Sequence, residues 1–339
     1  MMTRLLLKSG TALVAASLFV GCGDNDAFDA PDDIETQEQA VTGTYSSTSF
    51  QKGLVRLDFQ RGGRCSGFFV GPNMIATAAH CVDDKTITGS HEGVWNGMKW
   101  AELRVRIVYK PSASEVICIN ETCRNDNGTV RYTTILAWWD NSYSGGGDHQ
   151  SDVAVLTRLG GGNFIPRQPD PEDPAPRALN SNDYLRILSV AMPVPSGRRG
   201  GTDEWPGQAI GYGASADGVS VLDPRWGYIL TDHWGTHEIR ARYRSSLSIY
   251  SSAICAGDSG GPLVFQGAGI GSRRYAGGIA SKTSSRVSSC PEDGDNMWWA
   301  RLNSKMWMMN TILDWSGRSD CNTYYSDSLP GNGRYYRCW

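Results

Sequence analysis

Ser259 and His80 lie in sequence contexts that suit nucleophilic catalysis. Ser259 is the third residue of the hexapeptide Gly257–Pro262, and His80 follows Thr77-Ala78-Ala79 far upstream. A serine hydroxyl is a poor nucleophile at neutral pH. Acyl transfer therefore requires a glycine-flanked serine on a tight turn and a histidine, supplied from elsewhere, that accepts its proton. The alternatives are an incidental serine in a glycine-rich turn and a satisfied core histidine, and the complete motifs argue against both.

An aspartate between these two residues completes the set. Asp152 opens the apolar stretch Val153–Leu156, whereas two rival aspartates of the same region lie in polar, glycine-rich sequence, Asp140 and Asp148. The three motifs together resemble the trypsin/chymotrypsin-like serine proteases. The chain order His80, Asp152, Ser259 is that of this family and differs from the orders in subtilisin and the α/β-hydrolases. The resemblance implies that Ser259 is the nucleophile, that His80 is the general base and that Asp152 holds the imidazole tautomer.

The resemblance also implies roles for four further positions. The backbone N–H groups of Gly257 and Ser259 would form an oxyanion hole. Ser281 would support the buried aspartate, and its strand would pair with the substrate; the alternative is an ordinary strand serine. Asp258 would form an activation salt bridge with the ammonium of a new N-terminus created by cleavage, for which Val41 is the best match.

The expected substrate pocket contains no acidic residue. By the same resemblance, Ala253 occupies the pocket floor and is followed by Ile254, while Lys282 and Thr283 replace the usual aromatic residue and glycine of the wall. Met297 or a neighbour is expected to protrude into the pocket. Because a lysine or arginine side chain would be buried there without a counter-charge, we expect a small or medium apolar residue at P1.

Nine cysteines suggest an exported, disulfide-bonded protein. Without Cys22 an even number remains, and spacing alone cannot choose among the many pairings. The resemblance pairs Cys65–Cys81 and Cys255–Cys290, which leaves the sequence neighbours Cys118–Cys123 and Cys321–Cys338. No CxxC motif or histidine cluster indicates a metal site, so no metal and no cofactor are expected. Four other histidines lack a catalytic context and are expected at the surface: His91, His149, His233 and His237.

The N-terminus has the pattern of a targeting segment. Arg4 and Lys8 precede an apolar run over 11–20, which is too short to span a bilayer, and Gly21 precedes Cys22. This pattern resembles the bacterial lipoprotein signal, in which the cysteine is acylated; the alternative is an ordinary cleaved signal peptide. Residues 23–40 contain seven carboxylates and no Lys or Arg, which indicates an acidic tether or propeptide.

Alternating strand patterns begin at Leu54–Phe59 and resume at Gln208–Gly213, and only Ser304–Trp315 has helical spacing. With the resemblance, they predict an all-β fold of two six-stranded antiparallel β-barrels with a C-terminal helix. The expected segments are a signal peptide (1–21), the tether (22–40), a protease domain (41–315) and a C-terminal disulfide loop (316–339). Within the protease domain we expect barrel 1 at about 41–160, a crossing (161–205), barrel 2 at about 206–303 and the helix (304–315).

The sequence therefore predicts an exported serine endopeptidase that acts on protein or peptide substrates. It would be anchored to the cell envelope by lipid at Cys22, with later cleavage releasing a soluble domain. The formal net charge of −3 does not favour a nucleic-acid partner, and a monomer is expected. The alternative from another class is a surface binding or adhesion protein that retains the scaffold without significant proteolysis.

Overall fold

The structure is a computed structural model of the 339-residue chain. It describes the following residues: 53–85, 91–112, 115–120, 129–145, 148–164, 166–167, 186–188, 204–213, 224–247, 250–266, 274–284, 290–315, 322–325 and 334–337. Cys22, Val41, Cys123, Cys321 and Cys338 lie outside these residues, so the expected signal peptide, tether and activation site cannot be located.

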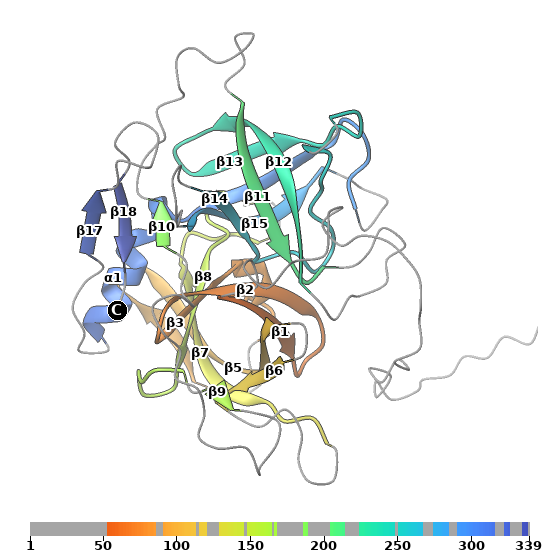
Figure 1. Cartoon of the computed structure of the whole chain (residues 1–339). Helices are drawn as coiled ribbons and strands as arrows, with labels where there is room; N and C mark the ends of the chain where they lie inside the picture. Colours follow the sequence, from red (N-terminus) through yellow and green to blue (C-terminus); the bar gives the residue numbers. More distant parts are fainter. Residues whose placement is uncertain are drawn as a thin grey trace, which may run out of the picture. The chain divides into compact units, whose positions relative to one another are not determined.

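The first barrel is formed by six antiparallel strands (Figure 1). In spatial order they are β1 (Leu54–Phe59), β2 (Arg64–Gly71), β3 (Met74–Thr77), β8 (Ala154–Arg158), β7 (Thr133–Asp140) and β5 (Met98–Ser112). Pairing of β5 with β1 closes the barrel. Three short strands extend the sheet: β4 (Glu92–Trp95), β6 (Glu115–Ile119) and β9 (Pro166–Arg167).

The second barrel closes in the same way. Its strands follow the order β11 (Trp205–Gly211), β12 (Arg225–Trp234), β13 (Glu238–Arg242), β16 (Asn296–Arg301), β15 (Arg274–Thr283) and β14 (Pro262–Gln266). Pairing of β14 with β11 completes the ring. The predicted pair of six-stranded antiparallel barrels is thus confirmed.

Three strands that the sequence did not predict extend the second sheet. β10 (Arg186–Leu188) pairs with β15 in parallel, β18 (Arg334–Arg337) pairs with β10, and β17 (Asn322–Tyr325) pairs with β18. The crossing and the C-terminal tail therefore contribute to one sheet, although both were expected to be loops.

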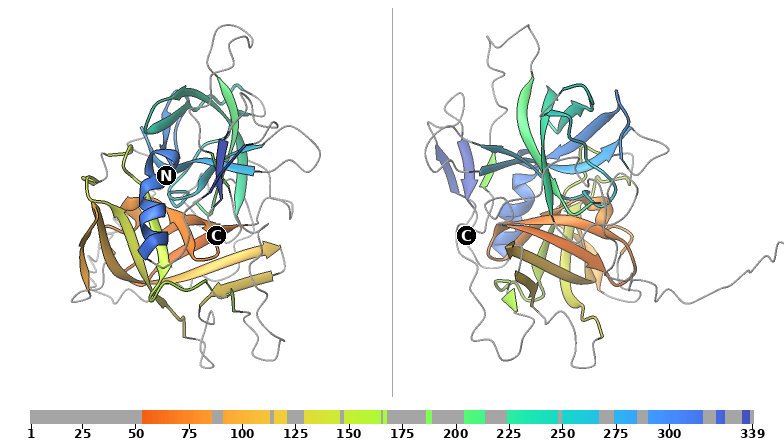
Figure 2. Two further views of the ribbon diagram at one scale, coloured as in Figure 1. Left: turned by 90° about the vertical axis from the view of Figure 1, so that its left-hand side faces the viewer. Right: turned by 45° about the vertical axis from the view of Figure 1, so that its right-hand side comes forward.

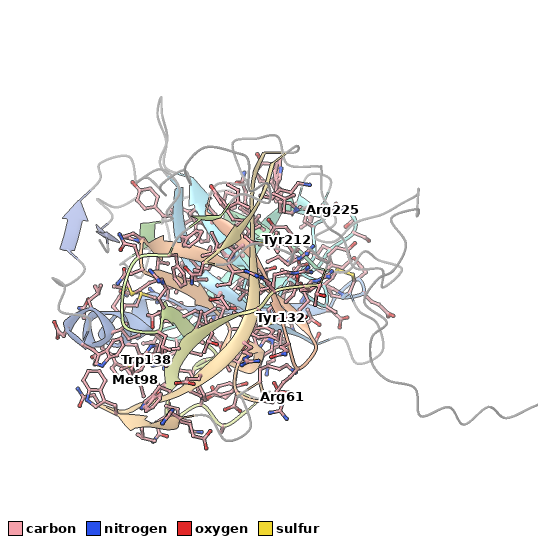
Figure 3. The ribbon with its side chains drawn as sticks, turned by 90° about the horizontal axis from the view of Figure 1, so that it is seen from below. Arg61, Met98, Tyr132, Trp138, Tyr212 and Arg225 are labelled. Atoms are coloured by element: carbon pink, nitrogen blue, oxygen red, sulfur yellow. A yellow bond between two sulfur atoms is a disulfide. The ribbon has the colours of Figure 1, made fainter. Side chains whose placement is uncertain are left out.

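Each barrel buries its own set of large apolar side chains. Phe68, Phe69 and Leu57 are fully buried in the first barrel, and Trp299 and Phe265 in the second. Removing this much apolar surface from water is the main favourable contribution to such a fold. Figure 3 shows the side chains around Met98 and Trp138, at one end of the first barrel.

The one α-helix among the described residues packs against the first barrel although it follows the second in the chain (Figure 2). A 3₁₀ turn, η3 (Asn303–Lys305), leads into α1 (Met306–Trp315), and the Trp315 and Trp138 ring centroids are 5.2 Å apart. The expected C-terminal helix is therefore present. Among the described residues, no helix is long and apolar enough to cross a membrane.

Candidate active site

His80 and Asp152 are brought together by neighbouring strands. His80 lies in the 3₁₀ turn η1 (Ala79–Cys81) after β3, and Asp152 lies just before β8. Thr77 of β3 is in register with Ala154 of β8. Because His80 closely follows Thr77 and Asp152 closely precedes Ala154, this pairing places His80 next to Asp152. A strand pairing near each motif thus converts a sequence separation of 72 residues into a direct contact.

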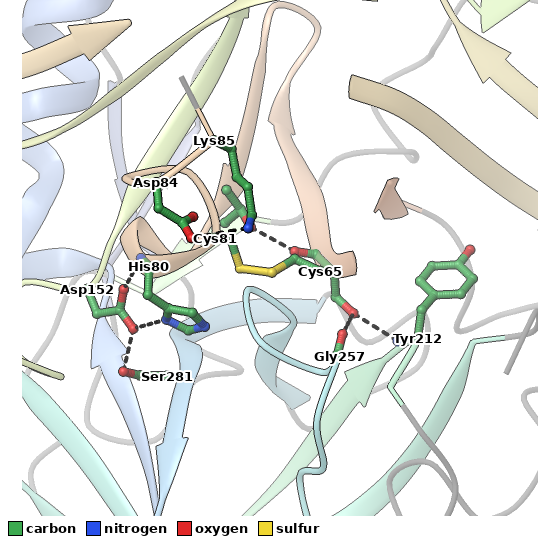
Figure 4. The surroundings of a disulfide bond; sticks show 11 residues. Cys65, His80, Cys81, Asp84, Lys85, Asp152, Tyr212, Gly257 and Ser281 are labelled. Atoms are coloured by element: carbon green, nitrogen blue, oxygen red, sulfur yellow. Dashed lines mark hydrogen bonds and ion pairs between the residues drawn. A yellow bond between two sulfur atoms is a disulfide. The ribbon is translucent and has the colours of Figure 1, made fainter. Parts of the chain in front are cut away.

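The Asp152 carboxylate accepts three hydrogen bonds (Figure 4). Its Oδ1 accepts the backbone N–H of His80 at 2.8 Å, and its Oδ2 lies 2.7 Å from His80 Nδ1. The Ser281 hydroxyl donates to Oδ2 at 2.5 Å. The Asp152 side chain is only 3% exposed and that of His80 is 29% exposed, so the carboxylate is shielded while the imidazole remains accessible.

Burial and the negative charge of Asp152 act together on a neighbouring phenol. Burial is the larger cause and the Asp152 charge the second, and both raise the pKa of Tyr143 above its usual value. The phenol therefore stays protonated at neutral pH. Tyr143 is one of the buried residues beside the aspartate that the sequence motifs did not indicate.

The Ser259 turn requires glycine on both sides. Gly257 has φ +89° and Gly260 has φ +85°, a region that favours glycine. A Cβ atom at Gly260 would lie 2.1 Å from the Ser66 carbonyl oxygen and 2.2 Å from the Thr77 hydroxyl oxygen. The turn therefore lies too close to the first barrel for any side chain at this position.

Ser66 of β2 fastens this turn to the first barrel. Its N–H donates to the Ser259 carbonyl at 2.8 Å, and its hydroxyl donates to the Gly257 carbonyl at 3.0 Å. The hydroxyl also accepts the N–H of Tyr212 at 2.8 Å. Sequence reasoning missed Ser66; its position directly after Cys65, which the resemblance pairs with the cysteine beside His80, was the available signal.

The backbone around Ser259 leaves two donors unused. Among the described residues, neither the N–H of Gly257 nor that of Ser259 donates a hydrogen bond within the protein. Within the same residues the Ser259 hydroxyl makes no hydrogen bond to His80, whose Nδ1 is held by Asp152. Such contacts are often long before substrate binds. The arrangement can therefore offer a nucleophile, a base and two N–H donors to a carbonyl substrate.

Residues 42–157 match the family model described as Trypsin, which covers most of the first barrel with His80 and Asp152. This part of the chain is therefore similar to the trypsin-like serine proteases. No curated protein matches the chain. Among solved structures, the chain is similar to "HL collagenase", with 16% identity, a TM-score of 0.47 and coverage of 81% of this chain and 98% of that chain.

Asp258, directly before Ser259 in the sequence, is completely buried. Its Oδ1 accepts the N–H of Gly213 and its Oδ2 accepts the N–H of Cys255, both at 2.8 Å. A Cβ atom at Gly211 would lie 2.1 Å from Oδ1, and one at Gly213 would lie 2.5 Å from Cγ. The two glycines therefore form the wall of the carboxylate's cavity.

Two disulfides lie at the site. Cys65–Cys81 links β2 to the His80 turn, and Cys255–Cys290 links the serine loop to the segment before β16. Cys118 is also disulfide-bonded. Disulfides are typical of proteins in oxidising environments outside the cytosol. Because Cys65 and Cys81 are bonded to each other, their cluster with His80 offers no thiolate ligands to a metal.

The residues expected to form the substrate pocket lie together in the second barrel. Ala253 and Ile254 are buried, and Met297 is fully buried with its sulfur 3.4 Å from the backbone nitrogen of Ile254. Thr283 is in register with Met297, and Lys282 is in register with Trp298. No carboxylate belongs to this described group, which is apolar apart from Ser281, Lys282 and Thr283.

A buried ion pair supports the loop that carries Asp152, and sequence reasoning missed it. Lys305 Nζ donates to Asp140 Oδ2 at 2.6 Å and to the Ser151 hydroxyl at 3.3 Å. Asp140 also accepts the N–H of Ser142 at 2.8 Å. A lone lysine before the apolar helix residues was the available signal, because a buried ammonium needs a partner.

Proposed function

We propose that the chain is an exported serine endopeptidase that hydrolyses peptide bonds through an acyl-enzyme. The observation that carries the proposal is the Asp152 carboxylate, which is shielded from solvent and holds both the backbone and the Nδ1 atom of His80. A buried aspartate in this position fixes the imidazole with its Nε2 lone pair directed outward, which is the tautomer that accepts a hydroxyl proton. We propose that Ser259 is the group that loses this proton.

The proton transfers follow from these positions. In acylation, the Ser259 oxygen attacks the substrate carbonyl, His80 takes the hydroxyl proton, and the N–H groups of Gly257 and Ser259 stabilise the oxyanion. His80 then gives the proton to the leaving amine, and the peptide bond breaks. In deacylation a water molecule replaces the amine, with His80 again the base, and Ser259 regains its proton. Asp152 stabilises the imidazolium formed in each half, and Ser281 stabilises Asp152.

A labelled fluorophosphonate tests the reaction class. The wild-type chain should form a covalent adduct at Ser259 and cleave a mixed peptide library. Ser259→Ala should retain its fold and lose at least about 10⁴-fold in turnover, because loss of the nucleophile removes the acyl-enzyme route. A chain that binds peptides but neither reacts with the probe nor cleaves them would instead be a binding protein on a protease scaffold, and the proposal would be wrong.

For specificity, we propose a small or medium apolar P1 residue. The support is that Ala253, Ile254 and Met297, three of the residues expected at the pocket, are apolar and would offer no counter-charge to a buried substrate ammonium or guanidinium. Matched peptide substrates that end in Val, Leu, Lys and Arg test this choice directly. Faster cleavage after Arg than after Val or Leu would contradict it.

For maturation, we propose cleavage before Val41 and pairing of its new ammonium with Asp258. The support is the complete burial of Asp258, a charged group that such a partner would compensate. N-terminal sequencing of active protein should begin at Val41; fully active protein that retains residues 23–40 would refute this step.

We also propose that Cys22 carries the lipid anchor of an exported precursor. The support is the small residue before Cys22 and the short apolar run that precedes it. Cys22→Ser should abolish partition into the membrane fraction; a precursor that partitions equally well without this cysteine would exclude the anchor.

A further inference from the structure

Three consecutive carbonyl groups of the Ser259 turn accept hydrogen bonds. The carbonyl of Asp258 accepts the N–H of Gly261 at 2.8 Å, and that of Ser259 accepts the N–H of Ser66 at 2.8 Å. The carbonyl of Gly257 instead accepts a side-chain hydroxyl, that of Ser66, at 3.0 Å. Two of these three contacts therefore come from Ser66, and its hydroxyl bond is the one that a substitution can remove without changing the backbone.

The peptide group between Gly257 and Asp258 is held at both of its polar atoms. Its oxygen accepts the Ser66 hydroxyl, and its N–H donates to the Cys255 carbonyl at 3.0 Å. Gly257 joins this peptide to the one that carries its own N–H, and its φ is +89°. Because a glycine restricts its two dihedral angles little, the direction of the Gly257 N–H depends on how firmly the next peptide is held.

The Ser66 hydroxyl also joins the turn to the segment that holds Asp258. It accepts the N–H of Tyr212 at 2.8 Å while it donates to Gly257, and both bonds are drawn in Figure 4. The next residue, Gly213, donates its N–H to Asp258 Oδ1 at 2.8 Å. These bonds form a closed ring that passes through the hydroxyl and the carboxylate. Because Ser66 and Asp258 are both 0% exposed, water does not compete for the bonds, which are stronger in such surroundings.

We propose that Ser66 is a positioning residue for the oxyanion hole, an inference that rests on the proposed acyl transfer. Its hydroxyl fixes the Gly257 carbonyl and thereby the direction of the Gly257 N–H, one of the two donors that would stabilise the oxyanion. Stabilisation of this kind depends on donors that are oriented before the charge develops. Ser66 does not touch the substrate in this role; it acts through the backbone of the turn.

Loss of the hydroxyl should affect the transition state more than substrate binding. The substrate carbonyl is neutral when it enters the site, and its oxygen becomes charged only as Ser259 attacks. An N–H group that points away from this oxygen therefore costs little in the ground state and more in the transition state. A variant without the hydroxyl should lose kcat and kcat/KM equally. A substitution that only lowered the stability of the fold would leave kcat per folded molecule unchanged.

Ser66→Ala in the otherwise intact full chain tests the proposal. For a peptide substrate kcat should fall about 10–100-fold, because loss of a donor itself costs about 10²–10³-fold and Ser66 acts only through a donor. KM should change less than about twofold. A peptide aldehyde, whose adduct with Ser259 places an oxygen in the hole, should bind about 10–100-fold more weakly, whereas the corresponding peptide alcohol, which forms no adduct, should bind as before. Ser66→Gly removes the same hydroxyl and should give the same losses.

Thr231→Val is the matched control, because it removes a buried hydroxyl with the same pair of bonds. Thr231 Oγ1 donates to the Trp205 carbonyl and accepts Trp234 Nε1, both at 2.9 Å, and Thr231 is 0% exposed. This variant should lose stability in a denaturant titration but keep the kcat and the aldehyde affinity of the parent. Parental kcat in folded Ser66→Ala or Ser66→Gly would overturn the proposal, as would an equal loss of kcat in Thr231→Val. A parent chain that neither cleaves peptides nor reacts with the fluorophosphonate would refute the proposed function itself, and this proposal with it.

Discussion

Replacing Lys305 with methionine should strongly destabilise the protein, because it leaves a buried carboxylate without its cation. The Lys305 and Asp140 side chains are only 8% and 12% exposed, and their Nζ–Oδ2 distance is 2.6 Å. Removing one partner of such a pair costs about 3–5 kcal/mol, since the remaining charge stays desolvated. Asp140 keeps the N–H of Ser142, which places the expected loss near the lower limit, at about 3 kcal/mol.

The effect should also depend on pH. Burial raises the pKa of Asp140, but hydrogen bonds from Lys305 and Ser142 outweigh it, so the pKa is lowered in the folded protein. A carboxyl group with a lowered pKa stabilises the fold above its ordinary value near 4, and this stabilisation is lost as the pH falls through the folded value. The difference in unfolding free energy between wild type and Lys305→Met should therefore be largest at pH 7 and decrease below about pH 4.

Guanidinium unfolding with the disulfides intact measures this difference. Lys85→Met is the matched control, because Lys85 pairs with Asp84 at 3.1 Å but Asp84 is 70% exposed, and such surface pairs contribute at most about 1 kcal/mol. Adding Asp140→Asn to Lys305→Met should recover part of the loss. A loss no larger than that of Lys85→Met, or one independent of pH, would refute the reasoning.

Two further substitutions probe other close contacts. Asp58→Asn should cost about 3–5 kcal/mol of unfolding free energy, measured by the same denaturant titration, because three arginines converge on this carboxylate. A loss below about 1 kcal/mol would contradict this. Gly260→Ala should reduce kcat at least about 100-fold while both disulfides still form, since the new Cβ would displace the Ser259 turn from the Ser66 carbonyl. Steady-state kinetics and mass spectrometry check this; unchanged kcat would show that the turn can shift freely.

The sequence was most informative where chemistry depends on residues close together in the chain. The serine hexapeptide and the segments around His80 and Asp152 could be recognised in the sequence, because the chemistry expected of each needs specific residue types at adjacent positions. The barrels followed from the family resemblance and alternating strand patterns. Both disulfides of the described site also followed from the resemblance, not from spacing.

Contacts between distant segments that the family resemblance does not specify were not predictable from the sequence. Lys305 and Asp140 are separated by 165 positions, and nothing in either neighbourhood specifies the other. The strand β10 has three residues and exists through its pairing with β15 and β18. His149 was expected at the surface because it lacks a catalytic context, but contacts with Trp298 and Glu238 leave its side chain only 19% exposed. In each of these cases the structure is determined by tertiary contacts and not by the local composition of the sequence.

Because of the hydrogen bonds of Ser66, the conformation of the Ser259 turn depends on contact between the two barrels. Ser66 belongs to one barrel, and the carbonyls it holds belong to the Ser259 turn of the other. A second barrel that folded alone would contain Ser259, but the carbonyl groups of its turn would lack the hydrogen bonds that Ser66 donates. Neither barrel alone would therefore hold the Ser259 turn in the conformation that the two barrels give it together.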